Sequence, residues 1–366
     1  MESMANITPD FWRGKRVLVT GHTGFKGTWL INLLTYFGAA VTGIALKSPT
    51  AEGDFFFKTT AEKKIRSVIA DVRDLSTVKK IFAECQPEIV FHLAAQPIVL
   101  ESYRDPVTTY ETNVMGTVNV LECVRLNDTV QSVINVTTDK VYENLEWVWG
   151  YRETDCLNGH DPYSNSKSCS ELVTASYKKS FFNARKVAVS TLRAGNVIGG
   201  GDFSPKRIIP DCVRAAINGD PIKIRNARSI RPYQHVLEPL YVYMLVAEKQ
   251  FLHKDLAGSY NIGPNESDTL TTGELANMFC TIWGENITWQ DTNESDAREA
   301  RLLRLDCSKL QSVFNWHPHM NAKKAVAKTV EWAKIYANNG NLTEITEKQI
   351  QEFLKVGGQH GARQLT

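Results

Sequence analysis

Residues 16–27 read RVLVTGHTGFKG, an apolar run that passes directly into a turn with a glycine at every third position. The β-branched first part of this stretch has the composition of a buried strand. The glycines Gly21, Gly24 and Gly27 then open a segment that predicts a helix over 27–38. Glycines in such a turn keep it tight and let backbone N–H groups approach a phosphate at the positive end of the helix.

Strand-like and helix-like segments continue to alternate through the first half of the chain. Further strands are predicted over 41–45, 67–70, 88–95, 132–136 and 187–195, and further helices over 75–85, 106–126 and 163–182. Repeated strand–helix–strand units are typical of a doubly wound parallel sheet, so we expect an α/β fold of the Rossmann type. The alternation fades near residue 200. We therefore expect a dinucleotide-binding domain over 1–200 and a smaller, mixed α/β substrate-binding lobe over 201–366, from which the chain can cross back to the sheet.

The composition argues against several classes of protein. The chain has 366 residues, 43% of them hydrophobic and 22% charged, and its net charge of +2 gives no basic field for nucleic acid. The N-terminus lacks the features of a signal peptide, and the apolar run near 240–247 is too short to span a membrane. The seven cysteines form no C-x-x-C pair, and His317 and His319 flank a proline as in an exposed turn, so no metal is expected. A cytoplasmic enzyme is the expectation.

The glycine turn favours dinucleotide binding because it lies in the first strand–helix unit of an alternating chain. About 20 residues further on, an NAD site usually carries an acid for the adenosine ribose. This chain has Lys47 there. A lysine can face a 2′-phosphate or simply carry surface charge, so the choice between NAD and NADP stays open. Asp71 and Val72 are predicted to contact the adenine, and the alternative is that Asp71 caps the helix at 75–85.

A second pattern follows the strand at 132–136, where residues 137–144 read TTDKVYEN. Gly or Asn-Gly would make a simple turn better than two hydroxyls, an acid and an amine. Further on, Tyr163 is the only tyrosine followed four residues later by a lysine, Lys167, which places both on one face of a helix. A neighbouring ammonium stabilises a phenolate, so we expect the pKa of this tyrosine to fall until it can act as a base. The alternative is a surface pair on an amphipathic helix.

These motifs occur in an order that resembles a known family. The chain offers GHTGFKG (21–27), HLAAQP (92–97), TNVMGT (112–117), TTDKVY (137–142), YSNSK (163–167) and LRAGNVIG (192–199). Their order and spacing resemble the extended short-chain dehydrogenase/reductase family over nearly the whole chain, from Val17 to about Trp316. Within that family, the segments TTDKVYEN, WVWGYRETD (147–155) and GHDPYSNSK (159–167) are similar to the nucleotide-sugar 4,6-dehydratases, in particular those that act on CDP-glucose.

The resemblance implies a role for each residue of the catalytic row, by which we mean Thr138, Asp139 and Lys140. Thr138 would bond the sugar 4-hydroxyl and Tyr163 would take its proton, while Lys167 would lower the tyrosine pKa and hold the nicotinamide ribose. After oxidation at C4, Asp139 would protonate the departing 6-hydroxyl and Lys140 would take the C5 proton; hydride returned to C6 would leave a 4-keto-6-deoxy sugar. A lysine with its ordinary pKa near ~10.4 is a poor base at neutral pH. The alternative is that Lys140 only orients Asp139 or the sugar while Asp139 or a water relays the proton.

The resemblance and the motifs together imply NAD as the cofactor and a nucleoside diphosphate sugar as the substrate. The predicted cofactor contacts are Gly21, Thr23, Gly24, Phe25, Lys26, Gly27, Lys47, Asp71, Val72, Leu93, Ala94, Ala95, Gln96, Thr112, Tyr163 and Lys167. The predicted substrate contacts are Thr138, Asn196, Arg231, Asn261, Arg298 and Arg301. The arginines suit a diphosphate because a guanidinium can bind it through two parallel hydrogen bonds.

Two features bear on packing and assembly. Trp147, Trp149 and Tyr151 can form a wall or lid over the sugar, or they can pack against the second lobe. The helices at 106–126 and 163–182 carry apolar residues beyond one stripe, and family members commonly pair these helices. The resemblance therefore implies a homodimer or tetramer, with core packing inside one subunit as the alternative.

Two other functions stay open. A nucleotide-sugar 4-epimerase would share the glycine turn, Thr138, Tyr163 and Lys167, but it would not need Asp139 beside Lys140. A non-catalytic dinucleotide sensor could lose Tyr163 or Lys167, and both are present. A bacterial dehydratase of the resembled kind would feed deoxysugar synthesis for surface polysaccharide such as the lipopolysaccharide O-antigen.

Overall fold

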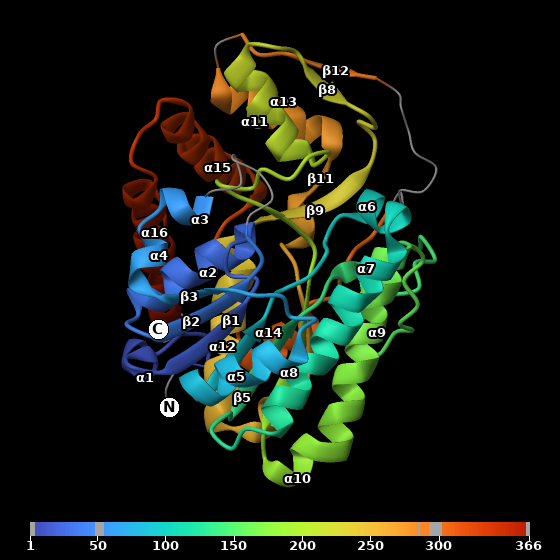
Figure 1. The fold of residues 1–366 in the computed structure, drawn as a ribbon. Helices are drawn as coiled ribbons and strands as arrows, with labels where there is room; N and C mark the ends of the chain where they lie inside the picture. Colours follow the sequence, from blue (N-terminus) through green and yellow to red (C-terminus); the bar gives the residue numbers. More distant parts are fainter. Residues whose placement is uncertain (1–3, 48–54, 285, 293–301, 364–366) are drawn as a thin grey trace.

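A computed structural model describes residues 4–47, 55–284, 286–292 and 302–363 of the chain. Its centre is a seven-stranded sheet with the order β10–β6–β5–β4–β1–β2–β3, and every neighbouring pair is parallel (Figure 1). The strands are β1 Arg16–Thr20, β2 Ala40–Ala45, β3 Arg66–Ile69, β4 Ile89–His92, β5 Ser132–Val136, β6 Ala188–Ala194 and β10 Ser259–Ile262. The predicted doubly wound α/β fold is confirmed.

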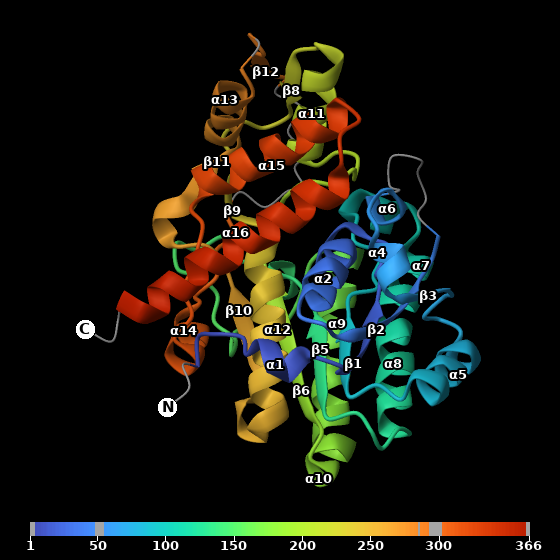
Figure 2. The ribbon, with the colours of Figure 1, turned by 90° about the vertical axis from the view of Figure 1, so that its left-hand side faces the viewer.

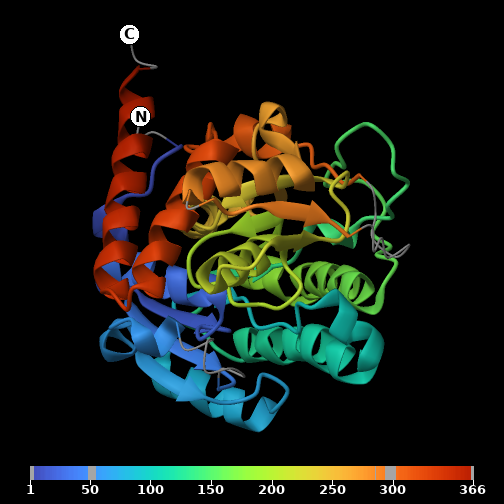
Figure 3. The same ribbon diagram turned by 90° about the horizontal axis from the view of Figure 1, so that it is seen from above.

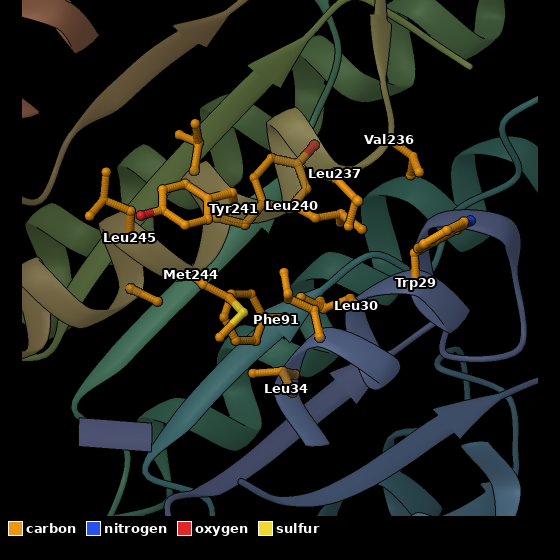
Figure 4. Close-up of a cluster of buried hydrophobic side chains, with 14 of the residues drawn as sticks. Trp29, Leu30, Leu34, Phe91, Val236, Leu237, Leu240, Tyr241, Met244 and Leu245 are labelled. Atoms are coloured by element: carbon orange, nitrogen blue, oxygen red, sulfur yellow. The ribbon is translucent and has the colours of Figure 1, made fainter. Parts of the chain in front are cut away.

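Helices cover both faces of the sheet (Figure 2). On one face lie α2 (Phe25–Tyr36) and α12 (Leu237–Leu252), and on the other α5 (Leu75–Cys85), α8 (Gly116–Arg125) and α9 (Pro162–Tyr177). Figure 4 shows Leu30 and Leu34 of α2 against Phe91 of β4 and Met244 of α12, all of them fully buried. Each such side chain contributes roughly 1.5–3 kcal/mol to folding. Strands buried on both faces explain why β1, β4 and β5 read as continuous apolar runs.

The predicted second lobe is built around two small sheets (Figures 1 and 3). One has the order β11–β9–β7 with one antiparallel and one parallel pair, and the other pairs β12 with β8. Its elements are β7 Asn196–Ile198, α11 Ile208–Asn218, β8 Ile222–Ile224, β9 Ile230–His235, β11 Thr269–Thr271, α13 Thr272–Trp283, β12 Trp289–Asp291 and α15 Ala322–Ala337. These elements enclose a hydrophobic core of their own.

The chain returns to the main sheet after the first part of this lobe. Strand β10 pairs with β6 from Ser259↔Thr191 to Ile262↔Ala194. Helix α12 packs on the same sheet, and Gln250 Nε2 donates to the hydroxyl of Ser132 at 2.8 Å. The second half of the chain therefore supplies an edge strand and a core helix to the first.

Several predicted boundaries differ from the structure. The helix predicted over 106–126 consists of α7 (Pro106–Tyr110), a π turn η1 (Glu111–Met115) and α8, and the one over 163–182 ends in a second π turn, η3 (Lys178–Phe182). The strand predicted over 88–95 ends at His92. The remaining elements are α1 Pro9–Trp12, α3 Phe55–Lys58, α4 Ala61–Lys64, α6 Val99–Arg104, η2 Asp139–Val141, α10 Asn183–Arg185, η4 Lys254–Leu256, η5 Glu266–Asp268, α14 Ser308–Phe314 and α16 Leu342–Arg363.

The expected exposed turn at the two histidines is wrong for His319. Its ring is half-buried and lies 5.3 Å from the Tyr241 ring and 4.9 Å from the Phe353 ring. Among the described residues, no group of three His, Cys, Asp or Glu side chains is placed to hold a metal ion. In the same part of the chain, no helix combines the length and apolarity needed to cross a membrane.

Glu238 of α12 gives the fold a measurable pH dependence. Its Oε1 accepts the backbone N–H groups of His319 and Met320 at 2.9 and 2.7 Å, and burial raises its pKa from 4.5 to about 8. Between these two values the folded protein holds a proton that the unfolded chain has lost. The contribution of Glu238 to the free energy of unfolding is therefore fully present below pH 4.5. It declines by about 1.4 kcal/mol per pH unit until pH reaches about 8.

We expect Glu238→Gln to remove this slope between pH 5 and pH 8, measured as the free energy of unfolding in urea. The exposed Glu266→Gln is the control, whose slope should match that of the parent. Parallel curves for the parent and Glu238→Gln would contradict the assignment.

Candidate active site

The glycine turn lies at the carboxyl end of β1, the edge at which doubly wound sheets bind ligands. Gly21 has a φ of +78°, and a Cβ there would lie 2.8 Å from the backbone nitrogen of Ala94. A Cβ on Gly27 would lie 2.1 Å from the carbonyl oxygen of Gly21. Gly24 caps α2 without a side-chain hydrogen bond, so the first N–H groups of the helix can bind an anion. Side chains at 21 or 27 would collide with this backbone, so the glycines keep the turn tight at the start of the helix. A tight turn of this kind forms a cradle that fits the pyrophosphate of a dinucleotide.

The loop after β4 lies against the turn. The N–H of Ala94 donates to the hydroxyl of Thr20 at 3.1 Å, and residues 93–95 are partly exposed beside the cradle. Gln96 bonds through its side-chain amide to neighbours within the protein and shapes the loop. Thr112 is half-buried in the π turn η1.

Two charged residues predicted near the adenosine differ in their surroundings. Lys47 is exposed in the loop after β2. Asp71 accepts from Nε of Arg73 at 2.9 Å, and this hydrogen bond lowers its pKa. Asp74, not Asp71, caps α5, so the alternative reading of Asp71 as a helix cap is wrong. The side chain of Val72 is only 4% exposed and belongs to the core, and its carbonyl accepts from Asn119 Nδ2 at 3.0 Å.

The catalytic row begins two residues after the end of β5. Thr138 donates from Oγ1 to Asp139 Oδ1 at 2.9 Å, and Asp139 opens the short 3₁₀ turn η2. The side chains of Thr138 and Asp139 are buried and that of Lys140 is half-buried. Ser168 of α9 donates to the Val141 carbonyl at 2.7 Å and ties this turn to the helix behind it.

Helix α9 presents Tyr163 and Lys167 to the same place. Asp161 caps the helix by accepting from the N–H of Ser164 at 3.0 Å. The Tyr163 phenol lies near the hydroxyl of Thr138, which favours the phenolate. Lys167 is 4% exposed, and its Nζ donates to the Val136 carbonyl at 3.1 Å. The alternative of a surface pair is wrong, because Lys167 is buried and Tyr163 is half-buried.

The expected fall in the pKa of Tyr163 is also wrong in this structure. Burial raises the pKa of Tyr163 to about 12, against smaller lowering effects of Thr138 and Arg207. Burial lowers the pKa of Lys167 to about 8, and the nearby charge of Lys26 adds to this effect. Desolvation therefore outweighs the stabilisation of the phenolate that the helical spacing predicted, because a charged group at a buried position loses its hydration.

The pKa of Asp139 differs from that of a solvated carboxyl. Burial raises the pKa of Asp139, while Lys140, the Thr138 hydroxyl, Arg231 and Lys26 oppose the rise. A carboxyl of this kind holds its proton to a higher pH and can donate it. At Asp139, desolvation outweighs the opposing effect of the adjacent Lys140 ammonium.

Two predicted substrate residues lie on neighbouring strands of the second lobe, and one of them acts on Asp139. Arg231 lies on β9, and its charge reaches Asp139. Asn196 begins β7 and hydrogen-bonds Tyr233 of β9. Between them, Gly195 lies against the carboxylate, since a Cβ on it would come within 3.3 Å of Asp139 Oδ2.

Asn261 does not face the cleft. Its side chain is fully buried, its Oδ1 accepts from the Tyr142 hydroxyl at 2.6 Å, and its Nδ2 donates to the Tyr151 carbonyl at 2.7 Å. The predicted contact with the substrate is wrong, because both ends of the amide bind the protein. Arg298 and Arg301 lie outside the described residues.

Sequence reasoning missed a cluster that the second lobe adds beside the turn. Arg207 pairs with Asp202 at 3.2 Å, and its charge acts on both Tyr163 and Lys26. Burial, followed by Arg207, lowers the pKa of Lys26 to about 8. The run GGGD at 199–202 was the available signal, because successive glycines mark a backbone that passes close to other elements.

The aromatic cluster packs against the second lobe. The Tyr151 ring stacks on Tyr142 with centroids 5.2 Å apart, and Trp147 lies 5.2 Å from Tyr151. The N–H of Tyr151 donates to the Arg304 carbonyl at 2.9 Å. These contacts favour packing over a lid, although Trp149 is 68% exposed.

Fold and site together define an α/β protein with a dinucleotide cradle and a Tyr–Lys pair beside a buried acid. The sequence pattern of the family described as GDP-mannose 4,6 dehydratase matches residues 18–329, and the chain belongs to this family. The dehydratase resemblance inferred from the motifs is thereby confirmed.

Individual relatives sharpen this placement. The chain is 43% identical to the CDP-glucose 4,6-dehydratase of Salmonella typhimurium over 356 residues, which cover 96% of this chain and 99% of the relative. It is 27% identical to a dTDP-glucose 4,6-dehydratase of Xanthomonas campestris, covering 86% and 92% of the two chains.

Solved structures share the fold. The UDP-glucose 4-epimerase of Thermus thermophilus in complex with NAD is similar with a TM-score of 0.74 and 25% identity, over 87% of this chain and 98% of that one. The dTDP-glucose 4,6-dehydratase of Bacillus anthracis in complex with NAD has a TM-score of 0.72 at 21% identity, over 88% and 98%.

Proposed function

We propose that this protein is an NAD-dependent lyase that converts CDP-glucose to CDP-4-dehydro-6-deoxyglucose and water. The observation that carries the proposal is the catalytic row, in which the buried Asp139 and the adjacent Lys140 adjoin the contact between Thr138 and Tyr163. An epimerase needs only the latter pair. The name of the Salmonella relative supports CDP-glucose as the substrate, since the match extends over 96% of this chain.

The cradle and its surroundings fit NAD. The glycine turn would hold the pyrophosphate, and Lys167 would hold the nicotinamide ribose. When bound, NAD⁺ supplies the acceptor for the hydride that leaves C4. The cofactor named for the Thermus structure supports NAD.

The residues of the row would then move protons on one bound sugar. Tyr163, beside Thr138, would take the proton of the 4-hydroxyl in its phenolate form, which the charge of Arg207 favours and burial opposes. A ketone at C4 acidifies the C5 proton, which Lys140 takes. Asp139 donates a proton to the 6-hydroxyl, which leaves as water, and reduction at C6 completes the product. Because Lys140 and Asp139 are held beside one bound sugar, neither proton transfer requires a separate encounter in solution.

Proton NMR of the protein with CDP-glucose and NAD⁺ in deuterated water tests this proposal. We expect a new 6-deoxy methyl signal together with deuterium at C5, because elimination and reprotonation exchange that position with solvent. CDP-galactose without deuterium would establish the epimerase instead. No change in CDP-glucose would contradict the substrate assignment and call for other nucleotide sugars.

The proposal includes a homodimer formed through α7, α8 and α9. An apolar hollow of about 460 Å³ is lined by Pro106, Val107, Tyr110, Glu111, Val114, Met115 and Cys169. Met115 of this hollow is 51% exposed and Leu172 of α9 is 57% exposed, whereas Leu121 of α8 is buried in the core. Pairing such a surface with its copy would remove the exposed apolar area from water.

We expect the parent to sediment as a dimer or as a tetramer of such dimers, and Met115→Glu to lower the assembly to monomers. A glutamate on the twofold surface would face its own copy across an apolar contact. Leu252→Glu is the matched control, because Leu252 is 51% exposed at the end of α12 and lies on another surface. A monomeric parent, or dissociation by Leu252→Glu alone, would contradict this interface.

The substrate also implies a place in the cell. A nucleotide sugar made inside the cell calls for a cytoplasmic enzyme, and the 4-keto-6-deoxy product is a precursor for deoxysugars of surface polysaccharide such as O-antigen. This part of the proposal is supported by the nature of the substrate, and fractionation of cells that express the protein would test it.

A further inference from the structure

A buried ion pair lies directly beneath the catalytic row. Arg193 of β6 donates from Nε and Nη2 to the two oxygens of Glu171 on α9, each at 2.9 Å, and both side chains are 3% exposed. A buried pair of this kind adds little to stability by itself, because desolvation of two charges offsets their attraction. The role of the pair therefore depends on the other residues to which it hydrogen-bonds.

The carboxylate holds the residue that precedes the row. Thr137 donates from Oγ1 to Glu171 Oε1 at 2.6 Å, and its N–H donates to the Leu192 carbonyl at 3.0 Å. Thr191 donates to the other oxygen of Glu171 at 2.7 Å. Thr137 is thus fixed to α9 and β6 at the point where the chain leaves β5.

The guanidinium holds the residue that follows the row. Arg193 donates from Nη1 to the Tyr142 hydroxyl at 2.8 Å and to the Glu153 carbonyl at 3.1 Å. The guanidinium carbon also lies 5.1 Å from the centre of the Tyr142 ring. Tyr142 in turn donates to Asn261 at 2.6 Å. One ion pair therefore hydrogen-bonds to the chain on both sides of residues 138–141.

The backbone of the row has weak internal support, although the Thr138 hydroxyl bonds Asp139 at 2.9 Å. The N–H of Lys140 meets the Thr138 hydroxyl at 3.4 Å, and the N–H of Val141 meets the Thr138 carbonyl at 3.5 Å, both at the long end for hydrogen bonds. We propose that Glu171 and Arg193 are positioning residues that fix Thr138, Asp139 and Lys140 against the sugar. This inference rests on the proposed function.

The same helix face adds a second link. Glu171 lies four residues after Lys167 and eight after Tyr163 on α9, so the three share one side of the helix. The charge of Glu171 raises the pKa of Lys167, against the larger effect of burial. Removing that charge lowers the pKa of Lys167 further, so its ammonium form is lost at a lower pH.

Glu171→Gln tests the proposal, with Glu248→Gln as the matched control. Glu248 is also fully buried, pairs with Lys249 at 2.8 Å and accepts from Trp12 Nε1 at 3.0 Å, away from the row. We expect Glu171→Gln to lower kcat for CDP-glucose by roughly tenfold to a hundredfold, because small misplacements of reacting groups are costly, with KM changed far less. The alkaline limb of its pH–rate profile should move to lower pH.

A pair of variants at Thr137 keeps the test independent of the fold. Thr137→Val keeps the shape but removes the hydroxyl that bonds Glu171, and Thr137→Ser restores it. We expect kcat to fall in the valine variant and to recover in the serine variant, with both melting near the parent. A Glu171→Gln protein that does not fold leaves this pair as the deciding measurement.

The outcomes separate the two proposals. Absence of turnover by the parent with CDP-glucose would overturn the proposed function. Turnover by the parent, combined with equal kcat values and pH profiles for Glu171→Gln and Glu248→Gln, would overturn the positioning role alone. If Glu171→Gln does not fold, equal kcat values for the valine and serine variants would have the same consequence.

Discussion

Tyr163→Phe is expected to lower kcat by roughly 10²–10⁴-fold while leaving NAD binding intact. The substitution keeps the ring and removes the hydroxyl that contacts Thr138. Because the cradle for the cofactor is made by the glycine turn, its affinity should not depend on the phenol. Turnover of CDP-glucose and NAD binding by calorimetry are the two measurements.

Tyr36→Phe is the control for this prediction. Tyr36 is 48% exposed at the end of α2, and its hydroxyl lies far along the chain from the row. A Tyr163→Phe protein with full activity would remove Tyr163 from the reaction. A parent that binds NAD but turns over no nucleotide sugar would instead support a dinucleotide sensor.

Asp139→Asn is expected to lower formation of the 6-deoxy product by roughly 10²–10⁴-fold, since asparagine keeps the shape and cannot donate the proton. Oxidation at C4 uses Thr138 and Tyr163 and should continue, so a 4-keto sugar that retains its 6-hydroxyl is expected with the variant. Mass spectrometry of quenched reactions distinguishes it from the dehydrated product. Equal rates for the variant and the parent would contradict the assignment of the acid.

The pH dependence of this step has a definite sign. Burial raises the pKa of Asp139, so the protonated acid persists to a higher pH than in a solvated aspartate. The rate of elimination should fall as pH rises through that raised pKa. Lys140→Met then separates the two roles, because loss of deuterium entry at C5 identifies Lys140 as the base, whereas retained exchange points to Asp139 or a water.

The sequence pattern correctly predicted strands whose limits are set by residues close to them in the chain. The strands at 16–20 and 132–136 were predicted with the bounds that the structure has, because β-branched runs ended by glycine or by polar residues leave little choice. The π turns inside the helices near 111–115 and 178–182 could not be predicted. They change the hydrogen-bond pattern of a helix without changing which residues favour one.

Site properties that depend on burial could not be read from spacing. The Tyr163–Lys167 pair was found from the sequence, but the direction of the tyrosine pKa was wrong because burial in the folded chain, which the spacing does not report, raises it. The prediction for Asn261 was wrong for a related reason. Its amide accepts a hydrogen bond from Tyr142, and it lies on β10, a strand from the second half of the chain that pairs with β6. Arg207 was missed because only the return of the second lobe brings it to the glycine turn.

The late arrival of β10 has a consequence for how the protein is made. Strand β6 is complete once residue 194 has been synthesised, yet its neighbour spans Ser259–Ile262. At roughly 5–20 residues per second, a nascent chain carries an open, parallel sheet edge for several seconds. An unpaired edge of that kind is a template for association between chains. A gene fragment that ends near codon 200 would make this transient edge permanent, so truncation there is a route to aggregates rather than to a separate cofactor domain.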